Sequence, residues 1–324
     1  MKTNLIYILG MMCLSGTVSA QTTVNYTEFE QKVLDYSQTL KQSVSQRTAM
    51  QKAMKAAKTA FFPAVDATGS YQYRINKYDM DFGGMAVPME HDSYSAEVGV
   101  VQPIYAGGSI YHTYKASQIQ SQIADKSVDL TTDNLIYAAE ASYWGTAAQK
   151  EMYKTMCQYV EIISQLTKVL QDKYDDGYIS KTDLIQMQTR LKEAELQRSS
   201  SYQSYQIALQ NMNVLMGLEP DKEVGLVDSI FVELPLPAYV GADAALNVRP
   251  DYAISQLDVD YQKRQVKLAA AKYNPSLSIG FKETWGTQML NISGETMFNS
   301  NVYASVKLPL FHWGARFKST AAQK

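Results

Sequence analysis

The chain has 324 residues, of which 46% are hydrophobic and 19% are charged, and its formal net charge is −2. This apolar content excludes a disordered chain, and the lack of net positive charge argues against nucleic acid as a partner. Tyrosine is abundant, with 23 copies against nine phenylalanines. Such an excess is typical of surfaces where a ring lies between an apolar and an aqueous phase.

Residues 1–20 have the layout of a secretory signal peptide. Lys2 precedes an apolar run, and the small residues Val18-Ser19-Ala20 precede Gln21. A membrane anchor is the alternative, but the apolar run is shorter than the ~20 residues of a membrane-spanning helix. We therefore expect export of the chain and cleavage after Ala20.

The remaining sequence is predicted to hold one repeated unit and the start of a second. The first unit covers residues 21–216, with a helix at 38–60, a β-hairpin at 64–104, a long helix at 109–173 and a further helix at 181–216. A connector of mixed structure follows at 217–246. The second unit starts within 247–324, with a helix at 250–272 and a β-hairpin at 276–310.

The repeat rests on matched spacings. Pro103 and Pro309 lie 206 residues apart, as do Gly108 and Gly314. Such a recurrence indicates an internal duplication. After Gly108 the first unit continues for 108 residues to Met216, whereas ten residues follow Gly314. We therefore expect the sequence to be a C-terminally truncated member of its family.

The hairpin strands alternate apolar and polar residues over about ten positions, as tilted transmembrane β-strands do. A soluble hairpin packed on its own helices would show the same alternation, so it remains the alternative. In the membrane interpretation, several chains must build one barrel, because a sheet in lipid cannot keep free edges. The predicted lipid-facing positions are Val65, Tyr71, Tyr73, Tyr94, Val98, Val100, Leu277, Ile279, Phe281, Val302 and Val306.

Four segments together resemble the TolC-like outer membrane efflux protein family. They are residues 174–184 (YDDGYISKTDL), 249–251 (RPD) and the two strand endings at 102–108 and 308–314. Their order and spacing make the match specific, and it covers essentially all of the chain after residue 20.

The resemblance implies a mainly α fold with membrane β-hairpins. Long periplasmic helical hairpins would form an α-barrel, and four transmembrane strands per chain would form a 12-stranded barrel in a homotrimer. The implied function is passive export across the bacterial outer membrane, within a tripartite efflux or type I secretion system. The implied partners are a periplasmic adaptor (membrane fusion) protein, an inner-membrane pump and outer-membrane lipid.

By the same resemblance, the turn after the long helix would be the periplasmic tip that contacts the adaptor. Its residues are Gly177, Tyr178, Ile179 and Ser180. A purely structural role is compatible with this one: Gly177 would end one helix in a left-handed conformation, and Thr182 or Asp183 would cap the next.

The sequence does not favour an enzyme, a metal site or a cofactor. The three histidines, His91, His112 and His312, lack metal-ligand spacing. Cys157, which the mature chain would keep as its one cysteine, is predicted to be a buried thiol without a nearby base. A periplasmic adaptor or scaffold with a coiled-coil hairpin is the rival class, and a non-functional fragment of the channel is a further alternative.

Overall fold

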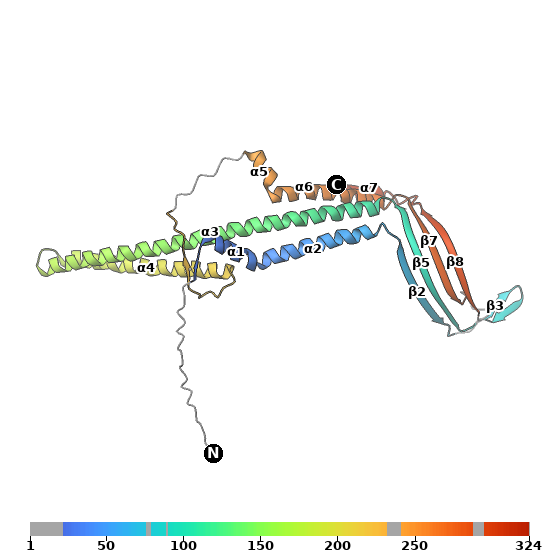
Figure 1. The fold of residues 1–324 in the computed structure, drawn as a ribbon, viewed down its shortest axis with the longest axis horizontal. Helices are drawn as coiled ribbons and strands as arrows, with labels where there is room; N and C mark the ends of the chain where they lie inside the picture. The colour runs from blue at the N-terminus through green and yellow to red at the C-terminus, as the bar shows by residue number, and fades with distance from the viewer. Residues whose placement is uncertain (1–21, 76–78, 89, 232–240, 288–294, 324) are drawn as a thin grey trace, which may run out of the picture. The chain divides into compact units, whose positions relative to one another are not determined.

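The computed structural model describes residues 22–75, 79–88, 90–231, 241–287 and 295–323 (Figure 1). The predicted signal peptide at 1–20 lies outside the described residues. Of the 217–246 connector, the part at 232–240 also lies outside them.

The described chain is mainly helical, as predicted, with short and long strands between the helices. The helices are α1 Tyr26–Tyr36, α2 Gln38–Thr59, α3 Ser109–Asp175, α4 Lys181–Leu215, α5 Ala242–Val248, α6 Pro250–Ala271 and α7 Ala315–Ala322. The strands are β1 Thr22–Val24, β2 Ala64–Tyr73, β3 Asp79–Phe82, β4 Met85–Pro88, β5 Asp92–Ala106, β6 Val224–Leu226, β7 Ser276–Thr287 and β8 Thr296–Lys307.

The expected long helices and paired strands are present within a few residues of their predicted bounds. α2 and α6 each end shortly before a proline, Pro63 and Pro275, because the residue before a proline avoids the helical region. Sequence reasoning did not find the short elements α1, β1 and β6, nor the β3–β4 hairpin inside the loop between β2 and β5.

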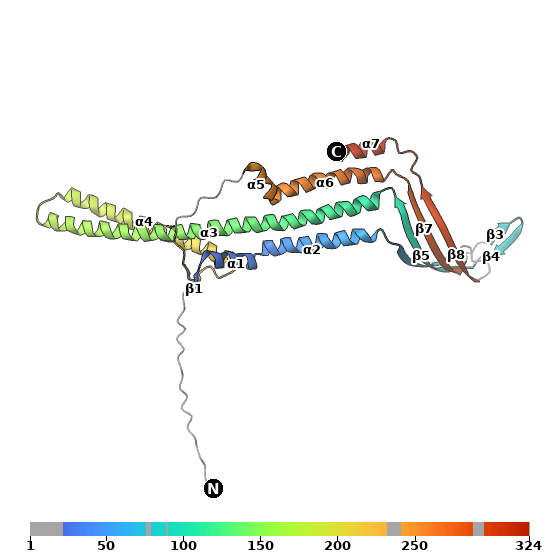
Figure 2. The same ribbon diagram turned by 45° about the horizontal axis from the view of Figure 1, so that its top comes forward.

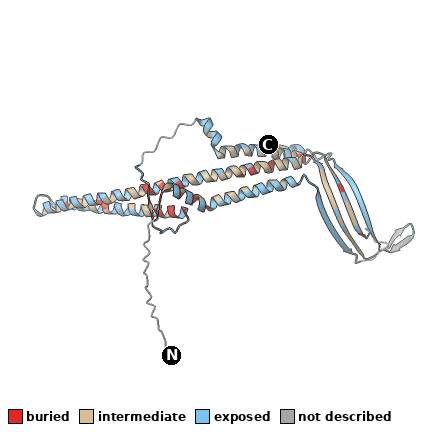
Figure 3. Ribbon diagram, viewed as in Figure 1, coloured by how far each residue is buried: buried red, intermediate tan, exposed pale blue. Residues whose placement is uncertain are grey.

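The chain divides into two compact units, and α3 contributes to both. In the first, which holds residues up to 38 and 132–237, β1 pairs in parallel with β6. Phe29 and Val33 of α1 pack there against Tyr143 of α3 and Met212 of α4, and all four are at most 1% exposed. Figure 3 shows this cluster as the main group of buried residues in the unit.

A polar network ties the same core together. The Tyr143 hydroxyl donates to a carboxylate oxygen of Asp228 at 2.7 Å, and it lies 3.1 Å from the carbonyl of Val24. The backbone N–H of Tyr26 donates to the same Asp228 oxygen at 2.8 Å. Burial and this hydrogen bond raise the pKa of Tyr143 well above its ordinary value. The network joins segments that lie up to 202 residues apart in the chain.

The second unit holds residues 39–131 and 238–324 and is built around a four-stranded sheet. The sheet has the order β2-β5-β7-β8, and every neighbouring pair is antiparallel. α2, the first part of α3 and α6 run beside one another toward this sheet (Figure 2). A groove of about 620 Å³ is lined by residues of all three helices.

The β5–α3 turn is held against the end of α6. Gly107 has a φ of +64°, and a Cβ placed on it would lie 2.5 Å from the carbonyl oxygen of Ala271. The Asn274 side chain donates to the Gly107 carbonyl at 2.9 Å. Only glycine fits such a close approach with a left-handed backbone, so Gly107 lets the β5–α3 turn pack directly against the end of α6. None of the described helices is both long and apolar enough to cross a bilayer.

Candidate membrane surface and hairpin tip

The register of the sheet places the alternating apolar residues of all four strands in common rows, on the same face of the sheet. Val65 of β2 pairs with Val100 of β5, which pairs with Phe281 of β7, which pairs with Val302 of β8. Paired residues in antiparallel strands project to the same face. The other rows follow the same register, with one irregularity between Pro103 and Tyr105.

One face of the sheet is therefore mainly apolar, although Asp92, Gln102, Glu283, Thr287, Thr296 and Ser300 also lie on it. It holds all eleven positions predicted from the sequence to face lipid: Val65, Tyr71, Tyr73, Tyr94, Val98, Val100, Leu277, Ile279, Phe281, Val302 and Val306. Ala67, Ala96, Trp285, Phe298 and Ala304 lie on the same face. That lipid covers this face stays a prediction.

The apolar side chains are open rather than packed on the helices. Val65 exposes 67% of its surface, Phe298 74% and Val302 84%. Every residue of β2 and of β8 is exposed, as the colouring of the outer strands in Figure 3 shows. The structure thus disfavours a soluble hairpin packed on its helices, because that alternative requires this face to be covered by the chain itself.

The height of the face matches a bilayer. From Leu277 to Thr287 the rows span ten residue steps, or about 34 Å at ~3.4 Å per residue. With a strand tilt of ~45° the band would be roughly 24 Å tall, close to the ~25 Å apolar band of outer-membrane barrels.

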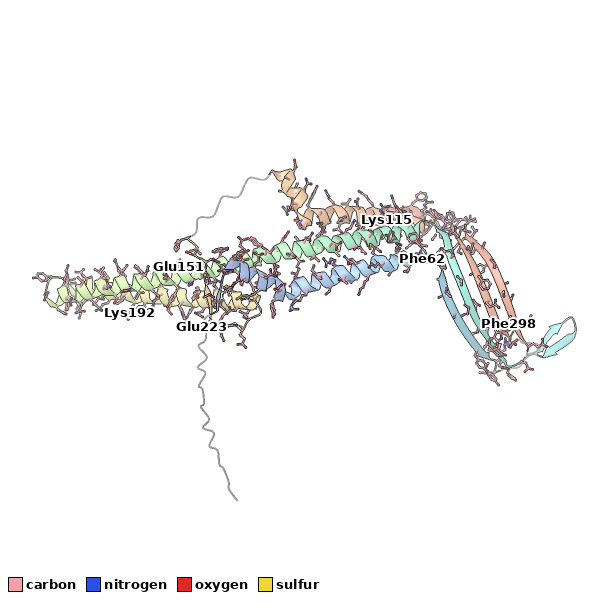
Figure 4. All side chains as sticks on the ribbon, in the orientation of Figure 1. Phe62, Lys115, Glu151, Lys192, Glu223 and Phe298 are labelled. Atoms are coloured by element: carbon pink, nitrogen blue, oxygen red, sulfur yellow. The ribbon has the colours of Figure 1, made fainter. Side chains whose placement is uncertain are left out.

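Aromatic residues gather at both ends of this band. At the end away from the helices, Tyr94 contacts Trp285 with ring centroids 5.6 Å apart, and Trp285 lies 6.5 Å from Phe298. At the helix end, Phe61 and Tyr114 are in edge contact at 5.9 Å. Figure 4 shows Phe62 where α2 meets the sheet and Phe298 toward the opposite end of the strands. Two aromatic girdles of this kind are typical of outer-membrane barrels.

The opposite face is polar. It carries an ion pair between Lys282 of β7 and Glu97 of β5, with the nitrogen and oxygen 2.5 Å apart. The hydroxyls of Ser70 and Ser95 are hydrogen-bonded across β2 and β5 at 2.8 Å. Charges and hydroxyls on this face, with none of the aromatic clusters of the other, are suited to contact with water.

Two acids depart from the pattern: Asp92, which pairs with Tyr73 at the start of β5, and Glu283 of β7. Glu283 lies in a row of the apolar face, where it pairs with Val98 on one side and Ser300 on the other. The Ser300 hydroxyl donates a hydrogen bond to its carboxylate. This bond gives the carboxylate a polar partner, Ser300, in the same row.

Both outer strands, β2 and β8, have a second edge that no strand of the described chain pairs. Long, flat and apolar edges of this kind are open to pairing with another chain.

The turn between α3 and α4 is fixed by local hydrogen bonds. Gly177 adopts a φ of +79°, and the N–H of Tyr178 donates to the Lys173 carbonyl at 2.8 Å, as in a Schellman motif. Ser180 is the N-cap of α4 and forms a reciprocal capping box with Asp183. Thr182 does not cap the helix, and the N-cap is Ser180, whose hydroxyl accepts from the N–H of Asp183; the Asp183 carboxylate takes part as the N3 residue of the capping box.

The turn presents an exposed aromatic ring. Tyr178 is 81% exposed, Gly177 and Ser180 are exposed, and Ile179 is half-buried. Because the backbone of the turn is held by its own hydrogen bonds, the Tyr178 ring projects from a defined platform.

The remaining groups with possible chemistry are metal-ligating side chains and the cysteine. Within the described ranges, no group of three His, Cys, Asp or Glu side chains is placed to hold a metal ion. Cys157 is a free thiol and half-buried, so the prediction of a buried thiol was wrong. Its position on α3 leaves it partly open to solvent.

A protein-family profile described as outer membrane efflux protein matches residues 30–218. The chain belongs to this family. No functionally curated protein sequence matches the chain. The outer membrane efflux family is a family of channel-type proteins rather than of enzymes.

Solved structures share the fold of this family member at low sequence identity. The CmeC outer membrane channel of Campylobacter jejuni has a TM-score of 0.76 and 17% identity over 92% of this chain. The outer membrane protein VceC of Vibrio cholerae has a TM-score of 0.73 and 14% identity, and the match covers 92% of this chain and 71% of VceC. A membrane protein of Pseudomonas aeruginosa has a TM-score of 0.78 and 13% identity, with 92% and 70% covered. The chain spans 64% of the length of CmeC.

Proposed function

We propose that this chain is a subunit of an outer-membrane channel that passively exports substrates in a tripartite efflux or type I secretion system. The observation that carries the proposal is the exposed apolar face of a sheet whose two outer strands keep an open edge. In lipid such edges would leave N–H and C=O groups unpaired, which costs several kcal/mol each. The sheet therefore has to close through other copies.

Three copies meet this requirement. One chain supplies four strands to the sheet, and the smallest usual membrane barrels have about eight. A homotrimer would form a barrel of twelve, with the apolar face toward outer-membrane lipid and the polar face, with Glu97 and Lys282, toward the lumen. The helices of the three copies would continue the pore on the periplasmic side as an α-barrel.

The helical hairpin tip is proposed as the contact for a periplasmic adaptor protein, which would join the channel to an inner-membrane pump. Tyr178 supports this role, since an exposed tyrosine on a rigid turn can bury a large area with little loss of conformational entropy. Gly177 and Ser180 would act by holding the backbone of the turn.

Cysteine crosslinking tests the closure. In a Cys157→Ser background, Ser70→Cys in β2 is combined in turn with Met297→Cys, Asn299→Cys or Asn301→Cys in β8. Oxidation of cells carrying the protein should give intermolecular products that end at a trimer, and these should stay in the outer-membrane pellet after a carbonate wash.

The sheet supplies its own positive control. Ser70 and Ser95 are hydrogen-bonded neighbours within one chain, so Ser70→Cys with Ser95→Cys should give an intramolecular disulfide under the same conditions. If that control pair oxidises while no β2–β8 pair links two copies, the channel assignment is wrong.

A further inference from the structure

Positive charge is concentrated where the helices of the second unit meet the sheet. Residues 46–63, 106–124, 261–275 and 308–323 lead into or out of the four strands. They contain eleven lysines and arginines and no aspartate or glutamate, although the whole chain has 30 basic and 32 acidic residues. The basic residues are Arg47, Lys52, Lys55, Lys58, Lys115, Lys263, Arg264, Lys267, Lys272, Arg316 and Lys318.

The depth of this cationic zone can be estimated along the helices. The first acids away from the strands are Asp260 on α6 and Asp125 on α3. They lie about 16 Å and 24 Å of helix from the sheet-side ends of these helices at ~1.5 Å per residue. The headgroup layer adds about 5–8 Å on each side of the hydrocarbon core, and a Debye length is about 8 Å at physiological salt. The zone without acids therefore covers the distance over which anionic headgroups act.

Within this zone, α3 and α6 enclose a hollow of about 300 Å³. It is lined by Lys115, Lys263, Arg264 and Lys267, with Asp260 as the one acid among its lining residues. Asp260 is paired with Lys263 at 2.9 Å. Arg264, Lys267 and Lys115 thus face the hollow without a carboxylate at ion-pair distance in the described chain.

The hollow also offers neutral donors and room. Gln118 and Gln122 line it beside the cations, and the Gln118 amide oxygen already accepts from Lys115 at 3.0 Å. A volume of 300 Å³ is about ten times the ~30 Å³ that one water occupies. A phosphodiester with part of its hydration shell fits this space.

Two neighbouring groups support an anionic ligand at the membrane boundary. His112, one turn before Lys115, has a pKa lowered by burial and then by the positive charges of Lys267 and Arg264. Its buried Nδ1 has no hydrogen-bond partner among the described residues. The Tyr114 ring lies beside Lys115, with the Lys115 nitrogen 6.0 Å from the ring centre, and such aromatic residues are common at the lipid–water interface. Figure 4 shows Lys115 next to the sheet.

We infer that the hollow between α3 and α6 binds the phosphate of an anionic phospholipid headgroup, such as phosphatidylglycerol, in the periplasmic leaflet. This inference rests on the proposed insertion of the sheet in the outer membrane. Lys115, Arg264 and Lys267 hold the phosphate, the glutamine amides donate to its oxygens, and the remaining basic residues of the zone attract the anionic leaflet. A lipid is favoured over a soluble anion because Lys115 and Lys267 of the hollow lie six and four residues from the sheet-side ends of α3 and α6, within the zone without acids.

The test compares the full chain reconstituted in phosphatidylcholine bilayers without or with phosphatidylglycerol. The phosphatidylglycerol that survives detergent washing is counted by mass spectrometry. Each Lys or Arg near an anionic surface contributes about a five-fold gain in binding. The variant K115Q/R264Q/K267Q should therefore lose roughly a hundred-fold in relative affinity for phosphatidylglycerol if the contributions add.

The matched control is K168Q/K173Q/R190Q, which removes the same charge from exposed positions of α3 and α4 in the other unit. It should retain phosphatidylglycerol like the unmodified chain. If circular dichroism shows that K115Q/R264Q/K267Q misfolds, the single variant K267Q replaces it, with an expected loss of about five-fold in relative affinity for phosphatidylglycerol.

The remaining outcomes each decide something. Equal retention of phosphatidylglycerol by K115Q/R264Q/K267Q and by its control overturns the inference. Displacement of the lipid by inorganic phosphate also overturns it, because the hollow would then be a site for soluble anions. Failure of the unmodified chain to enter bilayers of either composition overturns the channel assignment itself. Stable insertion without any preference for phosphatidylglycerol overturns only the headgroup site.

Discussion

The change in stability caused by a charged residue on the apolar face distinguishes a sheet that lies in a membrane from one that lies in water. Val302 on β8 is 84% exposed and pairs with Phe281 in the middle rows of the face. In water, replacing such an exposed side chain by arginine changes stability by about 0.5 kcal/mol or less. At the midplane of a bilayer, the same change on a lipid-facing strand costs about 2–4 kcal/mol.

The magnitude follows from the depth of the residue. Val302 lies two rows, or four residues, from Val306 at the helix end of the face. At ~3.4 Å per residue and a tilt of ~45°, this depth is roughly 10 Å in a band of roughly 24 Å. We therefore expect Val302→Arg to lower the folded-to-unfolded ratio by roughly 30- to 900-fold, the equivalent of about 2–4 kcal/mol.

The assay is reversible unfolding by denaturant in phospholipid vesicles, followed by tryptophan fluorescence. Asn299→Arg is the matched control, because Asn299 lies on the same strand, is exposed, and pairs with Thr284 on the polar face. It should change the free energy of unfolding by less than about 0.5 kcal/mol. Equal costs for the two variants would refute the assignment of the faces.

Three further results are expected. Gly107→Ala should lower the free energy of unfolding by more than about 2 kcal/mol, because the new Cβ would meet the Ala271 carbonyl at a left-handed φ. Gly145→Ala should raise it by up to about 1 kcal/mol, because Gly145 occupies an open position in a helix. Thermal unfolding measures both variants, and similar shifts in the two would count against the close approach at Gly107. Burial, and then the hydrogen bond with Glu30, raises the pKa of Tyr26 to about 12 from 10. Because the pKa of Tyr26 is higher in the folded than in the unfolded state, its contribution to the free energy of unfolding is complete below pH 10 and is lost as the pH rises toward 12. Tyr26→Phe should therefore make the free energy of unfolding fall less steeply over this pH range. An equally steep fall in the variant would contradict the raised pKa of Tyr26. Tyr178→Ala should leave thermal stability within about 0.5 kcal/mol while weakening co-purification with an adaptor, and unaltered co-purification would argue against the tip contact.

Much of the architecture was predictable because its signals are local. A helical period that ends at proline sets the limits of α2 and α6, and a period of two identifies which residues of each strand share a face. Gly177 and the polar run from Ser180 to Asp183 mark the α3–α4 turn in the sequence itself. The domain division drawn from the repeat, and the roles of the tip and of the apolar face, remain predictions.

Periodicity alone could not show which partners these elements meet. The register that aligns Val65 with Val302 depends on pairing across four strands, and the core of the first unit depends on Asp228, which receives bonds from residues far earlier in the chain. Such contacts have no sequence pattern, since either partner alone resembles an ordinary polar or apolar residue.

The sequence by itself determined that this chain is mainly helical, has alternating strands of membrane length, and resembles an outer membrane efflux protein. The tertiary structure decided that the apolar rows form one exposed face with open edges, and that Lys115 lies across a hollow from Arg264 and Lys267. The reason is physical: backbone conformation is governed by neighbouring residues, whereas a surface or a binding site forms only when distant segments pack together.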